Sequence, residues 1–382
     1  MDFDLRWLLF VLPAAFAIGW LASKLDTRQW KREQQGAPKA YFKGLNLLLN
    51  DQQDKAIDAF IEAVQRDPDT SELHFALGNL FRRRGEYERA VRVHQHLLQR
   101  GDLPRQERER AQYALAQDFL KAGLFDRAET AFSALRGTAF ESEAEMALLS
   151  LFERTRDWRQ AADVARRLEQ AGTASFAARI AHYQCEMALQ AQARNQDGEA
   201  ADLLAQARQV APQAARAHVL GGQMLARQGQ PAAAMAAFAE LLVVNPAAFS
   251  LVANDYAEAA QAAGCPEQAL PLLTAQYQRA PSMQLLQAIA RLEPASGLQR
   301  QRLTRHLRVQ PSLSAARELL TQSQNLLSAE EAPLVNAAID LALRPLQRYR
   351  CAACGFEAQH YFWQCPGCLT WDSYPPRHVE EL

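Results

Sequence analysis

The sequence has no excess of charge of either sign, since 42 Lys and Arg residues stand against 43 Asp and Glu, for a formal net charge of −1. No excess of basic residues therefore points to nucleic acid, and no nucleic acid is expected among its partners. The sequence also lacks a nucleophile elbow, a P-loop and a paired-carboxylate constellation. With 49% apolar residues the chain is too hydrophobic to be disordered. A folded protein that is not an enzyme is the first expectation.

Cysteine is scarce, and its few residues are unevenly placed. Four of the six fall in the stretch "CAACGFEAQHYFWQCPGC" near the C-terminus. They form two Cys-x2-Cys pairs separated by ten residues, and each pair predicts a tight turn that presents two thiolates to one metal ion. The predicted metal ligands are Cys351, Cys354, Cys365 and Cys368.

Three interpretations of these four cysteines remain open. A structural zinc ribbon is favoured, so zinc is the expected cofactor, and a rubredoxin-type iron centre for electron transfer is the first alternative. Thioredoxin-like redox chemistry or disulfide bonding is the second, although the motif lacks the surrounding βαβ pattern. Four protein ligands would leave no open position for a catalytic water.

The other cysteines and the histidines show no ligand pattern. Cys185 and Cys265 are isolated in helical stretches, where a cysteine usually behaves as a small apolar residue. The histidines have no second ligand nearby in the sequence, and we interpret them as packing or surface residues: His74, His94, His96, His182, His218 and His306.

The sequence contains one long run without charge, "WLLFVLPAAFAIGWLA", sixteen residues from Trp7 to Ala22. It is slightly short for a membrane-spanning helix, and a cleaved signal peptide or a buried core helix are the alternatives to an anchor. Acidic Asp2 and Asp4 precede the run, whereas Lys24 and Arg28 follow it. Because Lys and Arg collect on the cytoplasmic side, we predict a single-pass membrane anchor with the bulk of the chain in the cytoplasm.

Four segments are predicted from these features and from the repeats described next. Residues 1–23 form the anchor and residues 24–40 a polar linker. Residues 41–343 form a helical array, and residues 344–382 form the metal-binding domain.

An internal repeat dominates the middle of the chain. The segments "GLNLLLNDQQDKAIDAFIEAVQRDP" and "GNLFRRRGEYERAVRVHQHLLQRGD" align with an offset of 34 residues, which pairs Gly44 with Gly78 and Ala56 with Ala90. This period is typical of the tetratricopeptide repeat (TPR), in which small residues stand where two antiparallel helices cross. The expected fold is an all-α TPR solenoid that carries an N-terminal transmembrane helix and a small C-terminal rubredoxin-like zinc ribbon. An unrelated helical bundle has no reason to repeat Gly and Ala at this period.

A TPR array presents a concave face formed mainly by the first helix of each repeat, which suits a bound peptide or helix. The repeat register places five polar residues on this face as candidate partner-binding residues: Asn79, Arg82, Arg83, Gln117 and Lys121. An ordinary solvated face is the alternative interpretation.

The predicted ribbon is rich in aromatic residues for its size. We expect its aromatic side chains to pack against the array or against a partner: Phe356, Tyr361, Phe362, Trp363 and Trp371.

The order of anchor, TPR array and C-terminal four-cysteine ribbon resembles the lipopolysaccharide assembly protein B family of Gram-negative bacteria. The likeness runs nearly end to end, and its most specific stretches are "LNLLLNDQQDKAIDAF", "LGNLFRRRGE", "GLFDRAE" and "RYRCAACGF" with "YFWQCPGC". The Ala-rich residues 171–317 match only as generic repeats.

The resemblance implies an inner-membrane regulator of lipopolysaccharide synthesis. Its implied partners are a membrane-bound FtsH-type AAA+ protease, the UDP-3-O-acyl-N-acetylglucosamine deacetylase of the lipid A pathway, which the protease would degrade, and other lipopolysaccharide assembly proteins. Two further functions stay open, namely electron transfer at an iron centre and general assembly of envelope complexes by a TPR protein.

Overall fold

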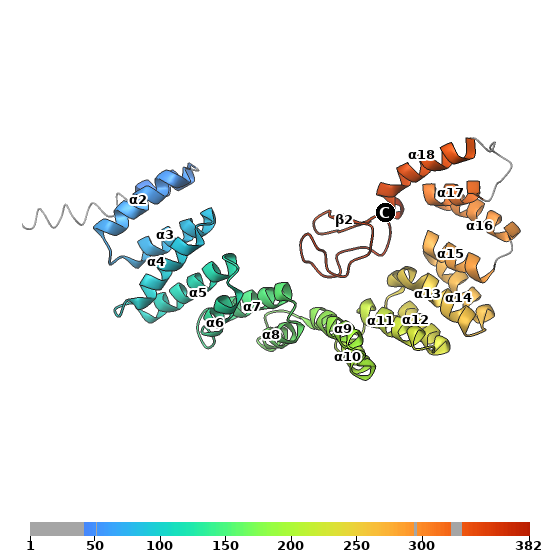
Figure 1. Ribbon diagram of the computed structural model, residues 1–382, viewed down its shortest axis with the longest axis horizontal. Helices are drawn as coiled ribbons and strands as arrows, with labels where there is room; N and C mark the ends of the chain where they lie inside the picture. The colour runs from blue at the N-terminus through green and yellow to red at the C-terminus, as the bar shows by residue number, and fades with distance from the viewer. Residues whose placement is uncertain (1–41, 51, 294–295, 322–330) are drawn as a thin grey trace, which may run out of the picture. The chain divides into compact units, whose positions relative to one another are not determined.

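The computed structural model describes residues 42–382, except for residues 51, 294–295 and 322–330 (Figure 1). The predicted membrane anchor and linker lie outside the described residues. The chain divides into two compact units, the first ending at Arg156 and the second covering Asp157–Leu382. Each unit is described by itself.

The first unit is wholly helical in its described part. Residues 42–49 are helical, and the helices that follow are α2 (Gln53–Arg66), α3 (Ser71–Arg84), α4 (Tyr87–Gln99), α5 (Arg105–Lys121), α6 (Phe125–Ser133) and α7 (Glu141–Thr155). Each helix packs against the next along the chain, and α3 also packs against α5, as expected when helical hairpins stack.

The second unit continues the helical pattern and ends in the ribbon. Its helices are α8 (Trp158–Gln170), α9 (Ala177–Ala193), α10 (Asp197–Val210), α11 (Ala215–Arg227), α12 (Pro231–Val244), η1 (Pro246–Val252), α13 (Ala253–Ala262), α14 (Pro266–Arg279), α15 (Met283–Leu292), α16 (Ser296–Val309), α17 (Leu313–Thr321) and α18 (Glu331–Leu346). The ribbon contains β1 (Tyr349–Arg350), β2 (Glu357–Ala358) and the short helix η2 (Val379–Glu381).

The predicted TPR register is confirmed where glycines stand at helix crossings. A Cβ atom added at Gly44 would lie 2.7 Å from the Phe60 ring, and one added at Gly222 would lie 2.4 Å from the Phe238 ring. Both phenylalanines are fully buried. Because the helices approach this closely only at glycine, the small residue and the large apolar residue of each repeat are two halves of one contact.

The helices bury one face each, as their sequences predict. In α8 the buried residues follow a helical spacing, Trp158, Ala161, Ala162, Val164, Ala165 and Leu168, and Asp157 accepts a hydrogen bond from the Gln160 amide at the helix start. In the second unit, one core cluster runs from α11 to α15 and includes Phe238, Phe249 and Tyr256. The all-α TPR solenoid with a C-terminal cysteine ribbon is thus the observed fold.

Candidate metal centre and docking surface

The four C-terminal cysteines meet at one point. All four Sγ atoms lie within 4.8 Å of one another. The Sγ atoms of Cys351 and Cys368 are 3.8 Å apart, and those of Cys354 and Cys365 are 3.7 Å apart. Four thiolates placed about 2.3 Å from a zinc ion at the corners of a tetrahedron would be about 3.8 Å apart. The donor set therefore fits a four-coordinate, closed metal site, and thiolate chemistry suits zinc or iron.

Two similar loops hold the sulfurs. In the first loop the Cys351 amide donates to the carbonyl of Phe356 and the Gly355 amide donates to the carbonyl of Cys351. In the second loop the Cys365 amide donates to the carbonyl of Thr370 and the Leu369 amide donates to the carbonyl of Cys365. Gly355 and Leu369, each directly after the second cysteine of its pair, both have positive φ, at 77° and 59°. The second loop thus places a leucine in a conformation that favours glycine.

Hydroxyl groups lie within hydrogen-bond distance of two of the sulfur atoms. The Ser373 Oγ atom lies 3.3 Å from Sγ of Cys351, and this hydrogen bond lowers the pKa of Cys351 to about 6. A hydrogen bond with the Thr370 hydroxyl, 3.3 Å from Sγ, likewise lowers the pKa of Cys368. The pKa of Cys354 is shifted the other way, to about 12, because its backbone hydrogen bond at Phe356, which lowers this pKa, is outweighed by desolvation and by the other three cysteines. Metals bind thiolates and not thiols, so a metal ion bound here would displace the proton of this ligand.

The remaining cysteines lie far from this cluster in the sequence and have different surroundings. Burial raises the pKa of Cys185 to about 12, so its thiol stays protonated. Cys265 lies 3.9 Å from Sδ of Met235 and is partly buried. The burial of Cys185 and the contact between Cys265 and Met235 agree with the interpretation of these two cysteines as packing residues.

The ribbon packs on α8 and α9, at the start of the second unit. The ring of Trp371 stacks on His182 of α9, with 4.5 Å between ring centroids and 18° between planes, and meets Trp158 and Tyr183 edge-on. Asp372, the next residue, lies 2.7 Å from Nε2 of His182, whose side chain is 1% exposed. One buried histidine on the array therefore contacts two consecutive ribbon residues.

The predicted aromatic residues of the ribbon divide between two surroundings. Tyr361, Trp363 and Trp371 are partly buried, and Trp363 packs against the core cluster of the second unit. Phe356 and Phe362 remain 43% and 38% exposed. The ribbon thus uses its tryptophans to contact the array and leaves two phenylalanines at its surface.

The five predicted partner-binding residues lie on α3 and α5 but differ in their contacts. Arg82 donates to the carboxylate of Asp118 at 2.8 Å and to the amide oxygen of Asn79 at 2.6 Å, so its charge is already paired. Gln117 is partly buried, whereas Arg83 and Lys121 are exposed.

Sequence reasoning missed Asp118. Its side chain is fully buried, and its carboxylate lies 2.5 Å from Nδ1 of His94, which is also fully buried. A signal was present in the repeat itself, because His94 falls where Phe60 and Phe238 fall in their own repeats, and a histidine there needs a polar partner.

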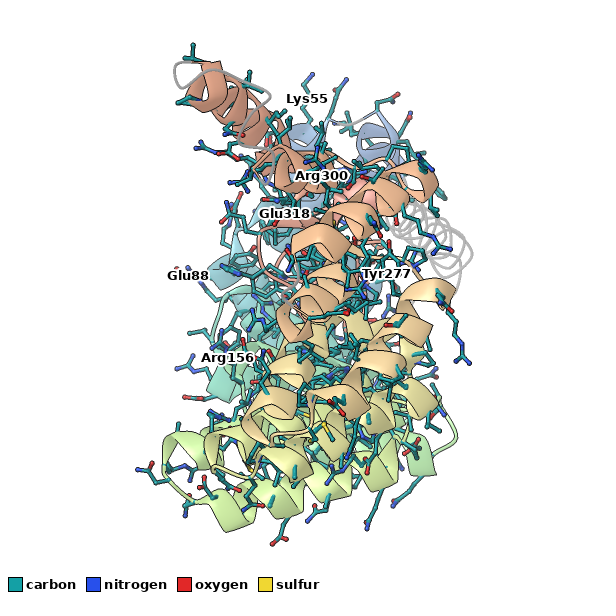
Figure 2. All side chains as sticks on the ribbon, turned by 90° about the vertical axis from the view of Figure 1, so that its right-hand side faces the viewer. Lys55, Glu88, Arg156, Tyr277, Arg300 and Glu318 are labelled. Carbon is teal, nitrogen blue, oxygen red and sulfur yellow. The ribbon has the colours of Figure 1, made fainter. Side chains whose placement is uncertain are left out.

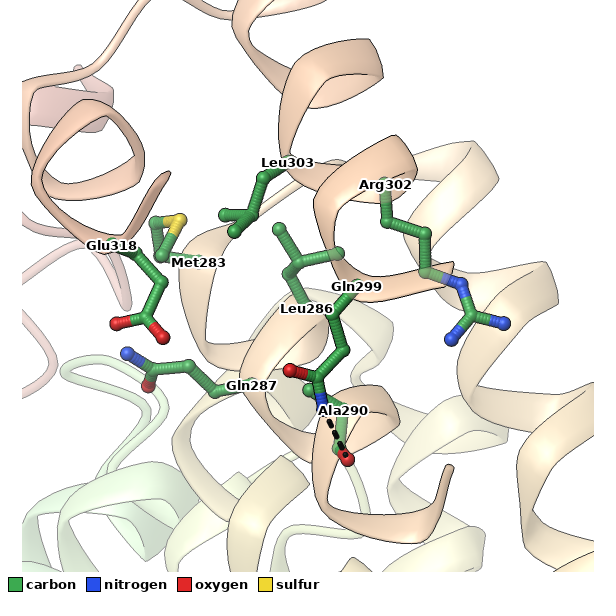
Figure 3. Close-up of a pocket in the computed structure, with 8 residues that line it drawn as sticks. All are labelled: Met283, Leu286, Gln287, Ala290, Gln299, Arg302, Leu303 and Glu318. Atoms are coloured by element: carbon green, nitrogen blue, oxygen red, sulfur yellow. Dashed lines mark hydrogen bonds between the residues drawn. The ribbon is translucent and has the colours of Figure 1, made fainter. Parts of the chain in front are cut away.

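Two cavities of the second unit differ in size. One of about 470 Å³ lies between α9, α11, α12 and α13, with Leu189, Leu220 and Phe238 among its apolar lining residues and Asp255 among its polar ones. The other, between α15, α16 and α17, holds only about 30 Å³ (Figure 3). Gln287 and Glu318 point toward each other at this smaller cavity, and Gln299 donates to the Ala290 carbonyl at 3.3 Å. It has room for water rather than for a ligand.

The surface carries charged side chains of both signs, among them Lys55, Glu88 and Arg300 (Figure 2). Within the described ranges, no helix has the length and the apolar content that crossing a membrane requires.

Comparisons with known proteins agree with both parts of the fold. A family model described as a rubredoxin metal binding domain matches residues 349–375, and a tetratricopeptide repeat model matches residues 43–103. Among solved structures, the TPR protein YrrB, described as having an unusual peptide-binding site, has a TM-score of 0.34 at 14% identity and covers 50% of this chain and 94% of its own. The structure of Naa15/Naa10 bound to HypK-THB has a TM-score of 0.42 at 13% identity, and the match covers 80% of this chain and 46% of that chain.

Whole-chain relatives are more informative. Lipopolysaccharide assembly protein B of Escherichia coli (strain K12) is 31% identical over 382 residues, which cover 97% of this chain and 98% of the relative. The protein of the same name from Haemophilus influenzae is 26% identical over 394 residues, with 98% of each chain covered. The four-cysteine ribbon, the TPR array and this end-to-end identity together show that the chain belongs to the lipopolysaccharide assembly protein B family.

Proposed function

We propose that this chain is a non-enzymatic scaffold, anchored in the inner membrane with its array in the cytoplasm, that regulates lipopolysaccharide synthesis. It would bring the UDP-3-O-acyl-N-acetylglucosamine deacetylase to an FtsH-type protease and so promote its degradation. The observation that carries this proposal is the sequence similarity to lipopolysaccharide assembly protein B over nearly the whole chain. The array and the ribbon of this chain also offer surfaces for protein contact. A shared membrane would raise the effective concentration of scaffold and protease.

In this proposal the metal has a structural role. Cys351, Cys354, Cys365 and Cys368 would hold one zinc ion, which joins the two loops and supplies folding free energy to a segment too small to build a core of its own. Among these four ligands, Cys351 and Cys365 are buried, whereas Cys354 is exposed. The ribbon residues Trp371 and Asp372 then keep their positions against α9.

The candidate partner surface is the exposed part of the first helices in the first unit. Of the five predicted partner-binding residues, Arg83 and Lys121 are exposed cations, whereas Arg82, Asn79 and Gln117 lie at partly buried positions beside them. Exposed Arg and Lys side chains suit a carboxylate-bearing segment of a partner.

The test measures metal content and deacetylase half-life for the wild type and for Cys365→Ser, with Cys265→Ser as the matched control outside the ribbon. We expect one equivalent of zinc in the wild type and the control, loss of the metal in Cys365→Ser, and a longer deacetylase half-life only in that variant. Iron in the wild-type protein, with its visible absorption, and an unchanged half-life would favour electron transfer instead. Zinc with an unchanged half-life would favour general envelope assembly and would refute the proteolytic role.

A further inference from the structure

The last residues of the chain return to the array. The short helix η2 places two consecutive glutamates at the N-termini of two first helices, α15 and α17. The amide of Met283 donates to Oε1 of Glu381 at 3.0 Å, and the amide of Ser314 donates to Oε1 of Glu380 at 3.0 Å. The Ser314 hydroxyl also donates to Oε2 of Glu380, at 2.5 Å. Each glutamate thus binds one helix.

Both helix ends are built for this contact. Ser282 caps α15 by accepting from the Leu285 amide at 3.3 Å, and Ser312 accepts from the Ala315 amide at 3.1 Å at the start of α17. Each serine satisfies one of the free amides of its first turn, and the glutamate satisfies another. Because Ser282 and Ser312 are only 4% and 7% exposed, water has little access to these ends.

Glu381 is an unusual residue to bury. It is 9% exposed, and its Oε2 atom has no hydrogen-bond partner among the described residues. A buried carboxylate is costly unless its charge is compensated, and the positive end of the α15 dipole offers compensation at short range. This placement indicates that the contact is specific and is not a chance position of a chain terminus.

The same tail is tied to the beginning of the ribbon. The Val379 amide donates to the carbonyl of Arg348 at 2.7 Å, directly before β1. The ring of His378 packs on Tyr349, with 4.5 Å between centroids, and lies 3.2 Å from the side-chain amide of Gln284 on α15. The residues that enter and leave the ribbon are therefore held together at the point where the glutamates bind.

We propose that Glu380 and Glu381 form a carboxylate clasp and that the paired N-termini of α15 and α17 are its binding site, specific for two adjacent acidic side chains. The clasp fixes the tail on α15 and α17, whereas Trp371 contacts His182 on α9. No cysteine takes part in the clasp, so its contacts are separate from those of the metal ligands. The inference does not depend on the proposed function.

The test is hydrogen exchange of the full-length protein in detergent, followed by mass spectrometry. Glu380→Ala/Glu381→Ala should speed exchange at least tenfold in the first turns of α15 and α17 and also in residues 371–379, with faster loss of metal to a chelator. Glu380→Gln/Glu381→Gln, which keeps one acceptor oxygen on each side chain and removes the charge, should show a smaller change in the same segments. Glu199→Ala/Glu267→Ala is the matched control, since it removes two exposed acidic side chains from the first turns of α10 and α14.

Faster exchange confined to α15 and α17, with residues 371–379 unchanged, would reduce the glutamates to ordinary helix caps and overturn the clasp. If the double alanine variant does not fold, a chain lacking Val379–Leu382 is mixed with a synthetic peptide of residues 375–382. Restored protection at Met283 and Ser314 supports a carboxylate site, whereas protection restored equally by the peptide with both glutamates replaced by alanine refutes it.

Discussion

Gly78 shows how little space a helix crossing leaves. A Cβ atom added there would lie 2.5 Å from Nε2 of His94 on α4, closer than any tolerable contact. His94 cannot turn away easily, because its Nδ1 atom lies 2.5 Å from the buried carboxylate of Asp118. The small residue, the histidine and the aspartate therefore form one tightly packed unit between α3, α4 and α5.

Gly78→Ala should consequently destabilise the protein by about 1–3 kcal/mol, because the added methyl group forces His94 or the helix backbone to shift. The matched control is Gly198→Ala in α10, where an added Cβ atom meets nothing within 4 Å. Alanine there should be neutral or stabilising by up to about 1 kcal/mol. Urea unfolding followed by circular dichroism measures both. Equal stability of the two variants would contradict the close contact.

At the scale of elements, the ribbon contacts α8, α9 and α11 through the large side chain of Trp371. Trp371 stacks on His182, meets Trp158 and Tyr183, and lies with its ring 5.8 Å from the guanidinium of Arg216. Aromatic and cation contacts of this kind each add about 0.5–1.5 kcal/mol beyond the burial of area. Loss of this one side chain should therefore loosen the ribbon.

Trp371→Ala should speed hydrogen exchange in the ribbon, increase access of acrylamide to Trp363 and leave the helix content of the array unchanged. The substitution should lower the free energy of unfolding by about 2–4 kcal/mol. This loss lies below or near the range for a fully buried tryptophan, because Trp371 is only partly buried. Phe362→Ala, which removes a more exposed aromatic residue of the same ribbon, is the control and should change ribbon exchange much less. Equal effects of the two substitutions would refute the assigned orientation of the ribbon.

These elements also show what the sequence could predict. Regular signals were sufficient for the repeats, since the spacing of Gly44 and Phe60 recurs at Gly222 and Phe238, and the Cys-x2-Cys pairs predicted that four sulfurs meet. The position of the ribbon could not be predicted, because the contact between His182 and Asp372 joins residues 190 positions apart and no local pattern marks either of them. The repeat marked His94 as a residue that needs a polar partner, but it could not indicate Asp118, since the partners Arg82 and His94 lie on other helices.

At the scale of the whole molecule, burial of histidine links stability to pH. Desolvation by burial is the main cause that lowers the pKa of His74, His306 and His378 below the value of 6.5 for an exposed histidine. The folded protein therefore holds these rings neutral at a pH where the unfolded chain already binds protons. The stability that these neutral rings contribute to the folded state is fully present above pH 6.5 and is lost as the pH falls below 6.5.

The melting temperature of the wild type should accordingly fall between pH 7.5 and pH 5. The melting temperature of His306→Gln should fall less steeply over the same range. His306 is 1% exposed and shares a hydrogen bond with Tyr277, with 2.7 Å between Nδ1 and the hydroxyl oxygen. Release of metal in acid affects every variant alike, so the comparison depends on slopes and not on absolute values. His360→Gln, at an exposed position, is the control and should keep the wild-type slope. An identical slope for His306→Gln would show that this ring contributes nothing to acid sensitivity.

Partner capture also belongs to the whole molecule, and the contacts of the first unit decide which charges can be tested. Reversal of Arg82 would break its pair with buried Asp118 and would confuse loss of binding with loss of folding, whereas Arg83 and Lys121 are exposed. Arg83→Glu/Lys121→Glu should therefore weaken crosslinking to the deacetylase or the protease in native membranes and leave the helix content intact. Capture by the wild type should weaken as salt concentration rises.

The control for this charge reversal is Lys55→Glu/Arg92→Glu, which makes the same change of charge at exposed positions on α2 and α4, the second helices of their repeats. If the exposed cations of the first helices hold an acidic segment, only the pair on α3 and α5 should lose crosslinks. Equal loss in both variants would indicate a general electrostatic attraction of the whole unit. Undiminished capture by Arg83→Glu/Lys121→Glu would remove this surface from consideration, and the exposed phenylalanines of the ribbon, Phe356 and Phe362, would then be the next surface to mutate.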